Sequence, residues 1–204
     1  MQAINGDLGK VISRYRDLVQ RYGYSSYLLS NLASHIKSLE DALRKVKDEF
    51  GGEQVRIADL GCGYGVLGRI VADYLGVAEL LCVDVDPKRL EIARNLCDRV
   101  LLIDITSPEL GEKFLEGYHL VMMHGVLEHV YDWDAVIVNV SNMLVNDGFF
   151  LLSIPNLGSW VNRLLLLFGY QPRDLEISRR GLFGVLKTKR YGTGPIDHVK
   201  NSNI

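Results

Sequence analysis

A glycine-rich stretch, IADLGCGYGVLG from Ile57 to Gly68, is the part of the chain whose residue types and spacing most suggest chemistry. Glycines let a backbone approach a ligand closely, and the N–H groups at the start of a helix point towards that ligand. Two patterns overlap in this stretch. Read from Gly61, with Asp59 before it, it fits Asp-x-Gly-x-Gly-x-Gly. Read from Gly63, it fits Gly-x-Gly-x-x-Gly, the pattern of dinucleotide-binding loops.

Three polar residues, Asp84, Asp104 and His124, each follow a largely apolar run. A carboxylate such as Asp84 accepts two hydrogen bonds from a ribose diol, more strongly than a neutral acceptor would. Asp84 also lies 21 residues after Gly63, where a dinucleotide site has its ribose-binding acid, so it fits both patterns. Asp104 is placed to accept a hydrogen bond from an exocyclic amine, and a cap before residues 106–108 is its competing role. Asp86 is better interpreted as the N-cap of a helix that begins at Pro87.

Apolar patterning predicts the elements that hold these residues. Apolar residues recur every three or four positions over residues 8–50, with a break at 23–26, which predicts two N-terminal helices. Short apolar strands are predicted at residues 55–60, 80–85, 100–105, 119–123 and 149–154. Helices are predicted between them at residues 66–74, 87–97 and 133–145, with a turn at 146–148. Apolar strands that alternate with helices indicate a doubly wound α/β fold with a mainly parallel sheet, in which ligands bind at the carboxyl ends of the strands.

Five segments of the chain resemble class I S-adenosylmethionine-dependent methyltransferases. ADLGCGYG resembles motif I of that family, LLCVDVDPKRLEIA its second motif and VLLIDI its third. YHLVMMHGVLEHV is similar to the strand-four motif of a subset with a Leu-Glu-His signature, and NMLVNDGFFLLSIPN is similar to the helix, turn and strand that follow it. These segments cover about residues 55–156 in the family's order, which favours the Gly61 register. The resemblance implies a Rossmann-like sheet of order 3-2-1-4-5, with the family's strands six and seven absent here.

The resemblance also implies that S-adenosylmethionine binds as the methyl donor. In the family's pattern Asp84 would hold the ribose diol and Asp104 the adenine amino group. Asp59 would lie beside the methionine ammonium, with a turn or helix cap as its alternative role. The expected donor-binding residues are Asp59, Gly61, Cys62, Gly63, Gly65, Asp84, Val85, Asp104, Ile105 and His124.

Methyl transfer from a sulfonium needs alignment and a suitable electrostatic surrounding rather than a covalent nucleophile. His124 is the candidate catalytic base, and shaping of the donor pocket is its alternative role. Some similar methyltransferases bind a divalent ion through Glu-x-x-Glu-His, but Gly125 stands where that motif has its first Glu. Glu128, His129 and His198 could still supply three ligands, yet with that Glu missing we expect no metal.

We expect three parts: an N-terminal helical cap at residues 1–52, a donor-binding core at 53–156, and a lid-like insertion with a basic loop at 157–204. Trp160 and Tyr170 are candidates for contact with the acceptor, with packing on the domain as the alternative. Basic residues among glycines at 179–190 would suit a phosphate-bearing or lipid-linked acceptor, with a solvated loop as the default. Strand five would form an exposed sheet edge, so we expect a truncated chain or a homodimer across that edge.

Composition limits the compartment and the partners. The 204 residues, with 48% hydrophobic and 24% charged residues, fit one globular domain, and the net charge of -2 makes a nucleic-acid partner unexpected. The charged N-terminus is no signal peptide and no apolar run could span a membrane, which predicts a cytoplasmic protein. Cys62, Cys82 and Cys97 lack metal-type spacing and are expected to be buried free thiols.

The sequence therefore predicts a methyltransferase that uses S-adenosylmethionine and modifies a small-molecule or a lipid- or glycan-linked acceptor, with oxygen as the expected acceptor atom. Two alternatives stay open. One is an NAD(P)-dependent oxidoreductase that uses the Gly63 register, and the other is a non-catalytic protein that binds S-adenosylmethionine.

Overall fold

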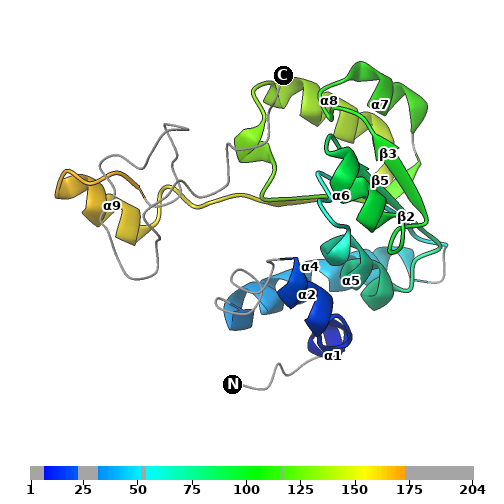
Figure 1. The fold of residues 1–204 in the computed structure, drawn as a ribbon, viewed down its shortest axis with the longest axis horizontal. Helices are drawn as coiled ribbons and strands as arrows, with labels where there is room; N and C mark the ends of the chain where they lie inside the picture. The colour runs from blue at the N-terminus through cyan, green and yellow to red at the C-terminus, as the bar shows by residue number, and fades with distance from the viewer. Residues whose placement is uncertain (1–6, 23–31, 52–53, 116, 173–204) are drawn as a thin grey trace. The chain divides into compact units, whose positions relative to one another are not determined.

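The structure, a computed structural model, describes residues 7–22, 32–51, 54–115 and 117–172 (Figure 1). The chain divides into two units, of which the first contains residues 1–126 and 132–153 and the second residues 127–131 and 154–204. The first unit holds the sheet and the N-terminal helices, and the second holds the short helix η1 (Leu127–His129) and α9 (Trp160–Leu167). The division into parts at 1–52, 53–156 and 157–204 stays a prediction.

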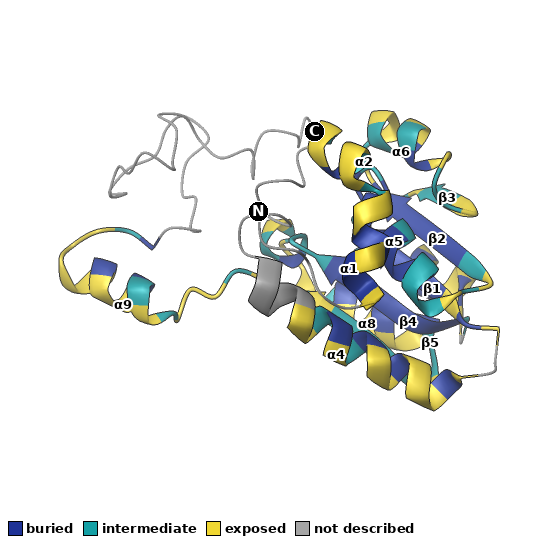
Figure 2. Cartoon of the chain, turned by 90° about the horizontal axis from the view of Figure 1, so that it is seen from below, coloured by how far each residue is buried: buried dark blue, intermediate teal, exposed yellow. Residues whose placement is uncertain are grey.

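The first unit is built on a five-stranded sheet of order β3-β2-β1-β4-β5, which confirms the predicted order and the Rossmann-like fold. The strands are β1 (Arg56–Leu60), β2 (Glu79–Asp84), β3 (Arg99–Leu102), β4 (Tyr118–His124) and β5 (Leu144–Ser153). Every pairing is parallel, so the carboxyl ends of all these strands lie at one edge of the sheet. The strands β1, β2 and β4 are buried almost throughout (Figure 2), which explains why their sequences are apolar without alternation.

Helices cover both faces of the sheet. Figure 1 shows α4 (Leu32–Phe50) and α5 (Val66–Leu75) on one side, and α7 (Pro108–Lys113) and α8 (Trp133–Met143) on the other. The remaining helix of the sheet, α6 (Pro87–Ala93), packs against β2 and β3. The N-terminal helices α1 (Asp7–Arg14) and α2 (Arg16–Arg21) add apolar side chains to the core that the sheet forms with α4 and α5. The predicted break at 23–26 lies outside the described residues. None of the helices in the described part of the chain is both long and apolar enough to cross a membrane.

The predicted ends of two elements are wrong, α7 was not predicted, and the first of the two predicted N-terminal helices is divided at Tyr15 into α1 and α2. β3 ends at Leu102 rather than at residue 105, because the Asp104 side chain accepts a hydrogen bond from the Thr106 N–H at 2.8 Å and turns the chain. The helix predicted at 87–97 ends at Ala93, after which the N–H groups of Asn95 and Leu96 donate to the carbonyls three residues earlier, as in tight turns, rather than four residues earlier, as in an α-helix. The short α7 has too few residues for a recognisable helical period.

The strand β5 begins at Leu144, before the predicted strand, and contains the predicted turn as an irregularity. Its register with β4 changes from Tyr118↔Leu144 to Leu120↔Phe149, so that extra residues of β5 have no partner. Asp147, within that segment, has a φ of 62°, a left-handed conformation that Asp tolerates better than most residues. The pattern at 146–148 correctly marked a bend, but pairing with β4 resumes across it.

Two of the three cysteines are not free thiols. Cys82 in β2 and Cys97 after α6 form a disulfide with their Cα atoms 6.1 Å apart, so the prediction of free thiols is wrong for this pair. Their pairing arises because the chain after α6 returns to β2. Cys62 is a buried free thiol, as expected. A cytoplasmic location stays a prediction, and this pair weighs against it because disulfides are rare in reducing compartments.

Candidate functional site

The glycine loop, residues 61–65, follows β1 and is shaped by three left-handed glycines. Gly61, Gly63 and Gly65 have φ values of 74°, 56° and 75°, which L side chains rarely adopt. The Gly61 N–H donates to the Val83 carbonyl at 2.8 Å and ties the loop to the end of β2. A Cβ on Gly61 would clash with the side chain of Val126, so the chain after β4 packs directly on the loop. The sequence therefore places its glycines where close approach requires them.

Asp84 lies at the end of β2 against the glycine loop and is 7% exposed. Its Oδ2 accepts a hydrogen bond from the Gly63 N–H at 2.8 Å, and its Oδ1 accepts one from the Asp86 N–H at 2.9 Å. A carboxylate oxygen has about two acceptor positions, so each oxygen keeps one for a ligand hydroxyl. The two backbone donors thus orient the carboxylate and leave one acceptor position on each of its oxygens. Asp86 caps α6 as predicted, since its side chain accepts from the backbone N–H groups of Lys88 and Arg89.

Asp59 is a buried carboxylate on β1 beside α5, with 3% of its surface exposed. Burial and the nearby charge of Asp84 raise its pKa from 3.8 to about 7, while a hydrogen bond from the Gly68 backbone opposes that rise. A Cβ on Gly68 would lie 2.7 Å from Asp59 Oδ2, so Gly68 allows α5 to approach β1 closely. Contact with the start of a helix, the alternative expected for Asp59, is therefore present. Its place beside an ammonium stays a prediction.

Cys62 is the residue of the glycine loop that carries a thiol. Its surroundings hold that thiol in the neutral form. Burial raises the pKa of the Cys62 thiol, and the nearby carboxylates of Asp59 and Asp84 add to the effect. Since the thiolate is the nucleophile and the metal ligand, the neutral Cys62 thiol is not a reactive group, and its contact with the donor stays a prediction.

Asp104 is exposed beyond the end of β3. Its Oδ1 accepts hydrogen bonds from both the N–H and the hydroxyl of Thr106, each at 2.8 Å, so the competing role as a cap is present. The Ile103 N–H donates to the Asp84 carbonyl at 3.3 Å, which places the end of β3 beside the end of β2. Asp104 is therefore near the proposed ribose carboxylate along the sheet edge, and its contact with adenine stays a prediction.

The sequence did not reveal a role for Asn139 of α8. This buried side chain donates to the carbonyls of Ile105 and Ser107 at 2.9 and 2.8 Å and fixes the chain after β3. The sequence did offer one signal for this role, namely a polar residue within the apolar pattern of the predicted helix. Ile105, an expected donor residue, is buried, whereas Val85 after β2 is 61% exposed.

His124 is half-buried at the end of β4. In the sheet β4 is the neighbour of β1, with Met122 paired to Asp59, so His124 emerges at the same edge as the glycine loop. Gly125 follows it with a φ of 63° and donates its N–H to the Ser153 carbonyl at 3.0 Å, which turns the chain away from the sheet. The structure thus brings His124 to the proposed site, while its catalytic role stays a prediction.

The other expected ligands and acceptor residues belong to the second unit or lie outside the described residues. Glu128 and His129 form part of η1 in the second unit, and His198 lies outside the described residues. Within the described ranges, no three His, Cys, Asp or Glu side chains gather in a way that could hold a metal ion. Trp160 begins α9 and is 73% exposed, and Tyr170 follows that helix. The basic residues at 179–190 also lie outside the described residues.

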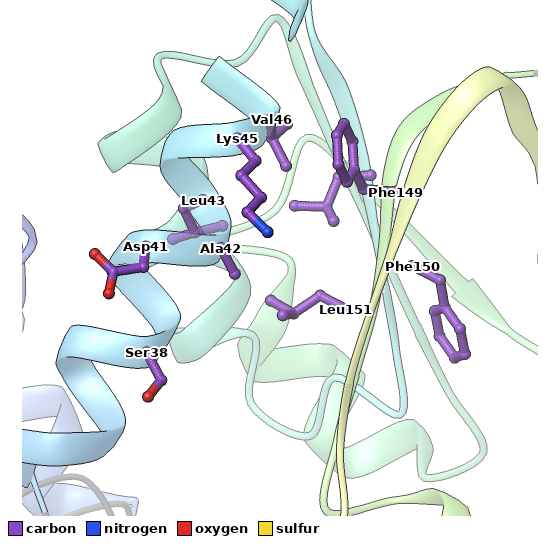
Figure 3. Close-up of a pocket in the computed structure, with 10 residues that line it drawn as sticks. Ser38, Asp41, Ala42, Leu43, Lys45, Val46, Phe149, Phe150 and Leu151 are labelled. Atoms are coloured by element: carbon purple, nitrogen blue, oxygen red, sulfur yellow. The ribbon is translucent and has the colours of Figure 1, made fainter. Parts of the chain in front are cut away.

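A separate cavity of about 490 Å³ lies between α4 and β5 (Figure 3). Figure 3 shows Phe149 and Leu151 on the α4 side of β5 and Phe150 on the opposite side. Asp41 and Lys45 of α4 also line the cavity. None of the expected donor-binding residues lines it, so this cavity is not part of the proposed site.

Comparison with known proteins gives a matching family model for one segment and a similar fold. Residues 58–150 match the family model of a methyltransferase domain. The sequence matches none of the curated proteins with which it was compared. The solved structure of the PH0226 protein from Pyrococcus horikoshii OT3 is 21% identical, with a TM-score of 0.51 over 68% of this chain and 63% of that chain.

Two S-adenosylmethionine-dependent methyltransferases are also similar. The enzyme from Mesorhizobium loti is 28% identical, with a TM-score of 0.46 over 55% of this chain and 51% of that chain. The enzyme from Archaeoglobus fulgidus is 19% identical, with a TM-score of 0.48 over 65% of this chain and 57% of that chain. This chain therefore spans between 51% and 63% of the length of these three proteins.

The matched segment contains the glycine loop, Asp84 and His124, which the sheet brings to one edge. The sheet order β3-β2-β1-β4-β5 is the one that the resemblance to methyltransferases implied. Residues 58–150 of this chain therefore match a methyltransferase domain, in agreement with the resemblance that the sequence motifs indicated.

Proposed function

We propose that this chain binds S-adenosylmethionine at the carboxyl ends of β1 and β2 and transfers its methyl group to an acceptor. One observation carries the proposal: two buried carboxylates, Asp59 and Asp84, flank the glycine loop. S-adenosylmethionine carries a sulfonium and an ammonium, which such a site attracts. The pKa of Asp59 is already raised to about 7, so a bound ammonium would favour its charged form, whereas the anionic pyrophosphate of a dinucleotide would oppose that form. The electrostatics therefore favour the Gly61 register over the Gly63 register.

Within this proposal, each strand end supplies one part of the donor site. Asp84 accepts hydrogen bonds from the ribose diol with the acceptor positions that its backbone donors leave open. Val85, an exposed apolar side chain next to it, offers a face for the adenine ring, and Asp104 accepts from the adenine amino group. Asp59 acts through the glycine loop on the methionine ammonium. Gly61, Cys62, Gly63, Gly65, Ile105 and His124 form the remaining walls.

The donor supplies an activated methyl group when it is bound. The acceptor forms a bond to the methyl carbon while the bond from that carbon to sulfur breaks, and the electron pair of that bond goes to the sulfur. The chain's own part is to align the two reactants and to remove the acceptor's proton where that is needed. We propose His124 for the proton because it lies at the sheet edge beside the glycine loop.

The acceptor is proposed from the resemblance to the Leu-Glu-His subset alone. We propose a small-molecule or a lipid- or glycan-linked acceptor that is methylated on oxygen. A phosphate on the acceptor would suit the basic residues at 179–190 of the sequence. A homodimer across β5 is proposed as well, since β5 is the edge strand of the described sheet.

Calorimetry with S-adenosylhomocysteine, S-adenosylmethionine and NAD tests the donor directly. We expect the first two to bind and NAD to give no signal. Binding of NAD alone would establish the Gly63 register and an oxidoreductase, and binding of none of the three would refute the proposal. A protein that binds the donor but transfers no methyl group to candidate acceptors would agree with the non-catalytic alternative.

A further inference from the structure

An aromatic contact joins the N-terminal helices to the glycine loop. Tyr22, the residue after α2, stacks its ring on that of Tyr64, with ring centroids 4.5 Å apart and planes inclined by 26°. Tyr64 stands between Gly63 and Gly65 in the glycine loop. Both tyrosines are half-buried and pack against the hydrophobic core. Stacked aromatic pairs stabilise a structure beyond the area that they bury.

The glycine loop needs such a contact because its backbone is unusually free. Three of its residues are glycines in left-handed conformations, and glycine loses more conformational freedom than any other residue when it is fixed. Hydrogen bonds from the Gly61 and Gly63 backbone hold the loop against β2. The Tyr64 ring adds a contact between the loop and a different element, the end of α2.

The same ring connects to the proposed ribose-binding carboxylate. The Arg89 guanidinium carbon lies over the Tyr64 ring, 5.8 Å from its centroid. Arg89 Nε lies 3.4 Å from Asp86 Oδ2, and the Asp86 N–H donates to Asp84 Oδ1 at 2.9 Å. A continuous series of contacts therefore runs from Tyr22 through Tyr64, Arg89 and Asp86 to Asp84.

We propose that Tyr22 is a positioning residue for the methyl donor, which holds the glycine loop in its donor-binding conformation by stacking on Tyr64. The inference rests on the proposed function and adds α2 to the parts of the chain that determine donor affinity. Loss of the Tyr22 ring leaves the glycine loop with more conformations, of which only some bind the donor. The expected loss of affinity is about two- to tenfold, the effect of one aromatic pair.

Calorimetric titration of the full chain with S-adenosylhomocysteine tests this role. Tyr22→Ala should weaken binding by about two- to tenfold, and Tyr22→Phe, which keeps the ring, should restore it. Tyr15→Phe is the matched control. It removes the hydrogen bond from Tyr15 Oη to Asp73 Oδ2 at 2.6 Å, which also ties the N-terminal helices to α5. That variant should lower the melting temperature and leave the affinity unchanged.

A double-mutant cycle identifies the path of the effect. If Tyr22 acts through Tyr64, the variant with both Tyr22→Ala and Tyr64→Ala should bind no more weakly than Tyr64→Ala alone. Tyr22→Leu keeps an apolar side chain without an aromatic face, and it replaces Tyr22→Ala if the latter does not fold. Wild-type affinity in Tyr22→Ala or Tyr22→Leu, or additive losses in the cycle, would overturn the inference and leave the proposed function standing. A wild-type chain that does not bind S-adenosylhomocysteine would overturn both.

Discussion

The buried carboxylate of Asp59 should make the stability of this protein depend on pH, and Asp59→Asn removes that dependence. Its pKa is raised from 3.8 to about 7 in the folded chain, so between these values the folded protein keeps a proton that the unfolded chain has lost. The folded state therefore loses stability as the pH rises through this range, and the loss is complete above pH 7. At 1.36 kcal/mol for each pKa unit, the free energy of unfolding falls by roughly 4 kcal/mol.

Urea unfolding followed by circular dichroism between pH 5 and pH 8 measures this effect. Asparagine has the shape of the protonated acid and can accept the Gly68 hydrogen bond, but its buried amide costs about 1–3 kcal/mol where it lacks partners. We expect Asp59→Asn to be no more stable than the wild type at pH 5 and more stable by about 1–3 kcal/mol at pH 8. Asp98→Asn is the control, since its carboxylate also accepts a backbone N–H of β2 but lies on an exposed residue. If Asp59→Asn and the wild type kept the same difference in stability at every pH, the reasoning from burial and charge would be wrong.

Four further substitutions test the site and its supports. Gly68→Ala places a Cβ 2.7 Å from Asp59 Oδ2, which should lower the free energy of unfolding by about 1–3 kcal/mol. Alanine favours the helix over glycine by about 1 kcal/mol, so a higher melting temperature than that of the wild type would contradict the packing argument. Asp84→Ala removes the proposed ribose contacts and should weaken S-adenosylhomocysteine binding at least about tenfold by calorimetry, whereas unchanged affinity would refute the role assigned to β2. His124→Ala should reduce turnover more than donor affinity, and an equal loss in both would assign His124 to the donor pocket. Cys97→Ser should cost about 3 kcal/mol under oxidising conditions and nothing in dithiothreitol; an equal cost in both would show that the disulfide does not form in solution.

Local features of this chain could be predicted from the sequence because the interactions that cause them span only a few residues. The apolar runs predicted the five strands, and the family resemblance predicted their order. The glycines at 61–65 marked the position of the loop. Asp86 followed by Pro87 marked the start of α6, since a helix cap joins neighbours in the sequence. The same reasoning misplaced the end of β3, where the hydrogen bonds of Asp104 to Thr106 outweighed the apolar character of Ile103 and Ile105.

Tertiary structure alone decided the features that join residues far apart in the chain. Cys82 and Cys97 meet because the chain after α6 returns to β2, and Tyr22 meets Tyr64 because α2 packs beside the glycine loop. The pKa of Asp59 depends on complete burial and on the charge of Asp84, neither of which its neighbours in the sequence reveal. The sequence by itself thus determined the local elements, and it predicted which residues could bind a donor. The packing of distant segments determined how these residues are buried, oriented and held in place, because burial and contact are properties of the folded chain.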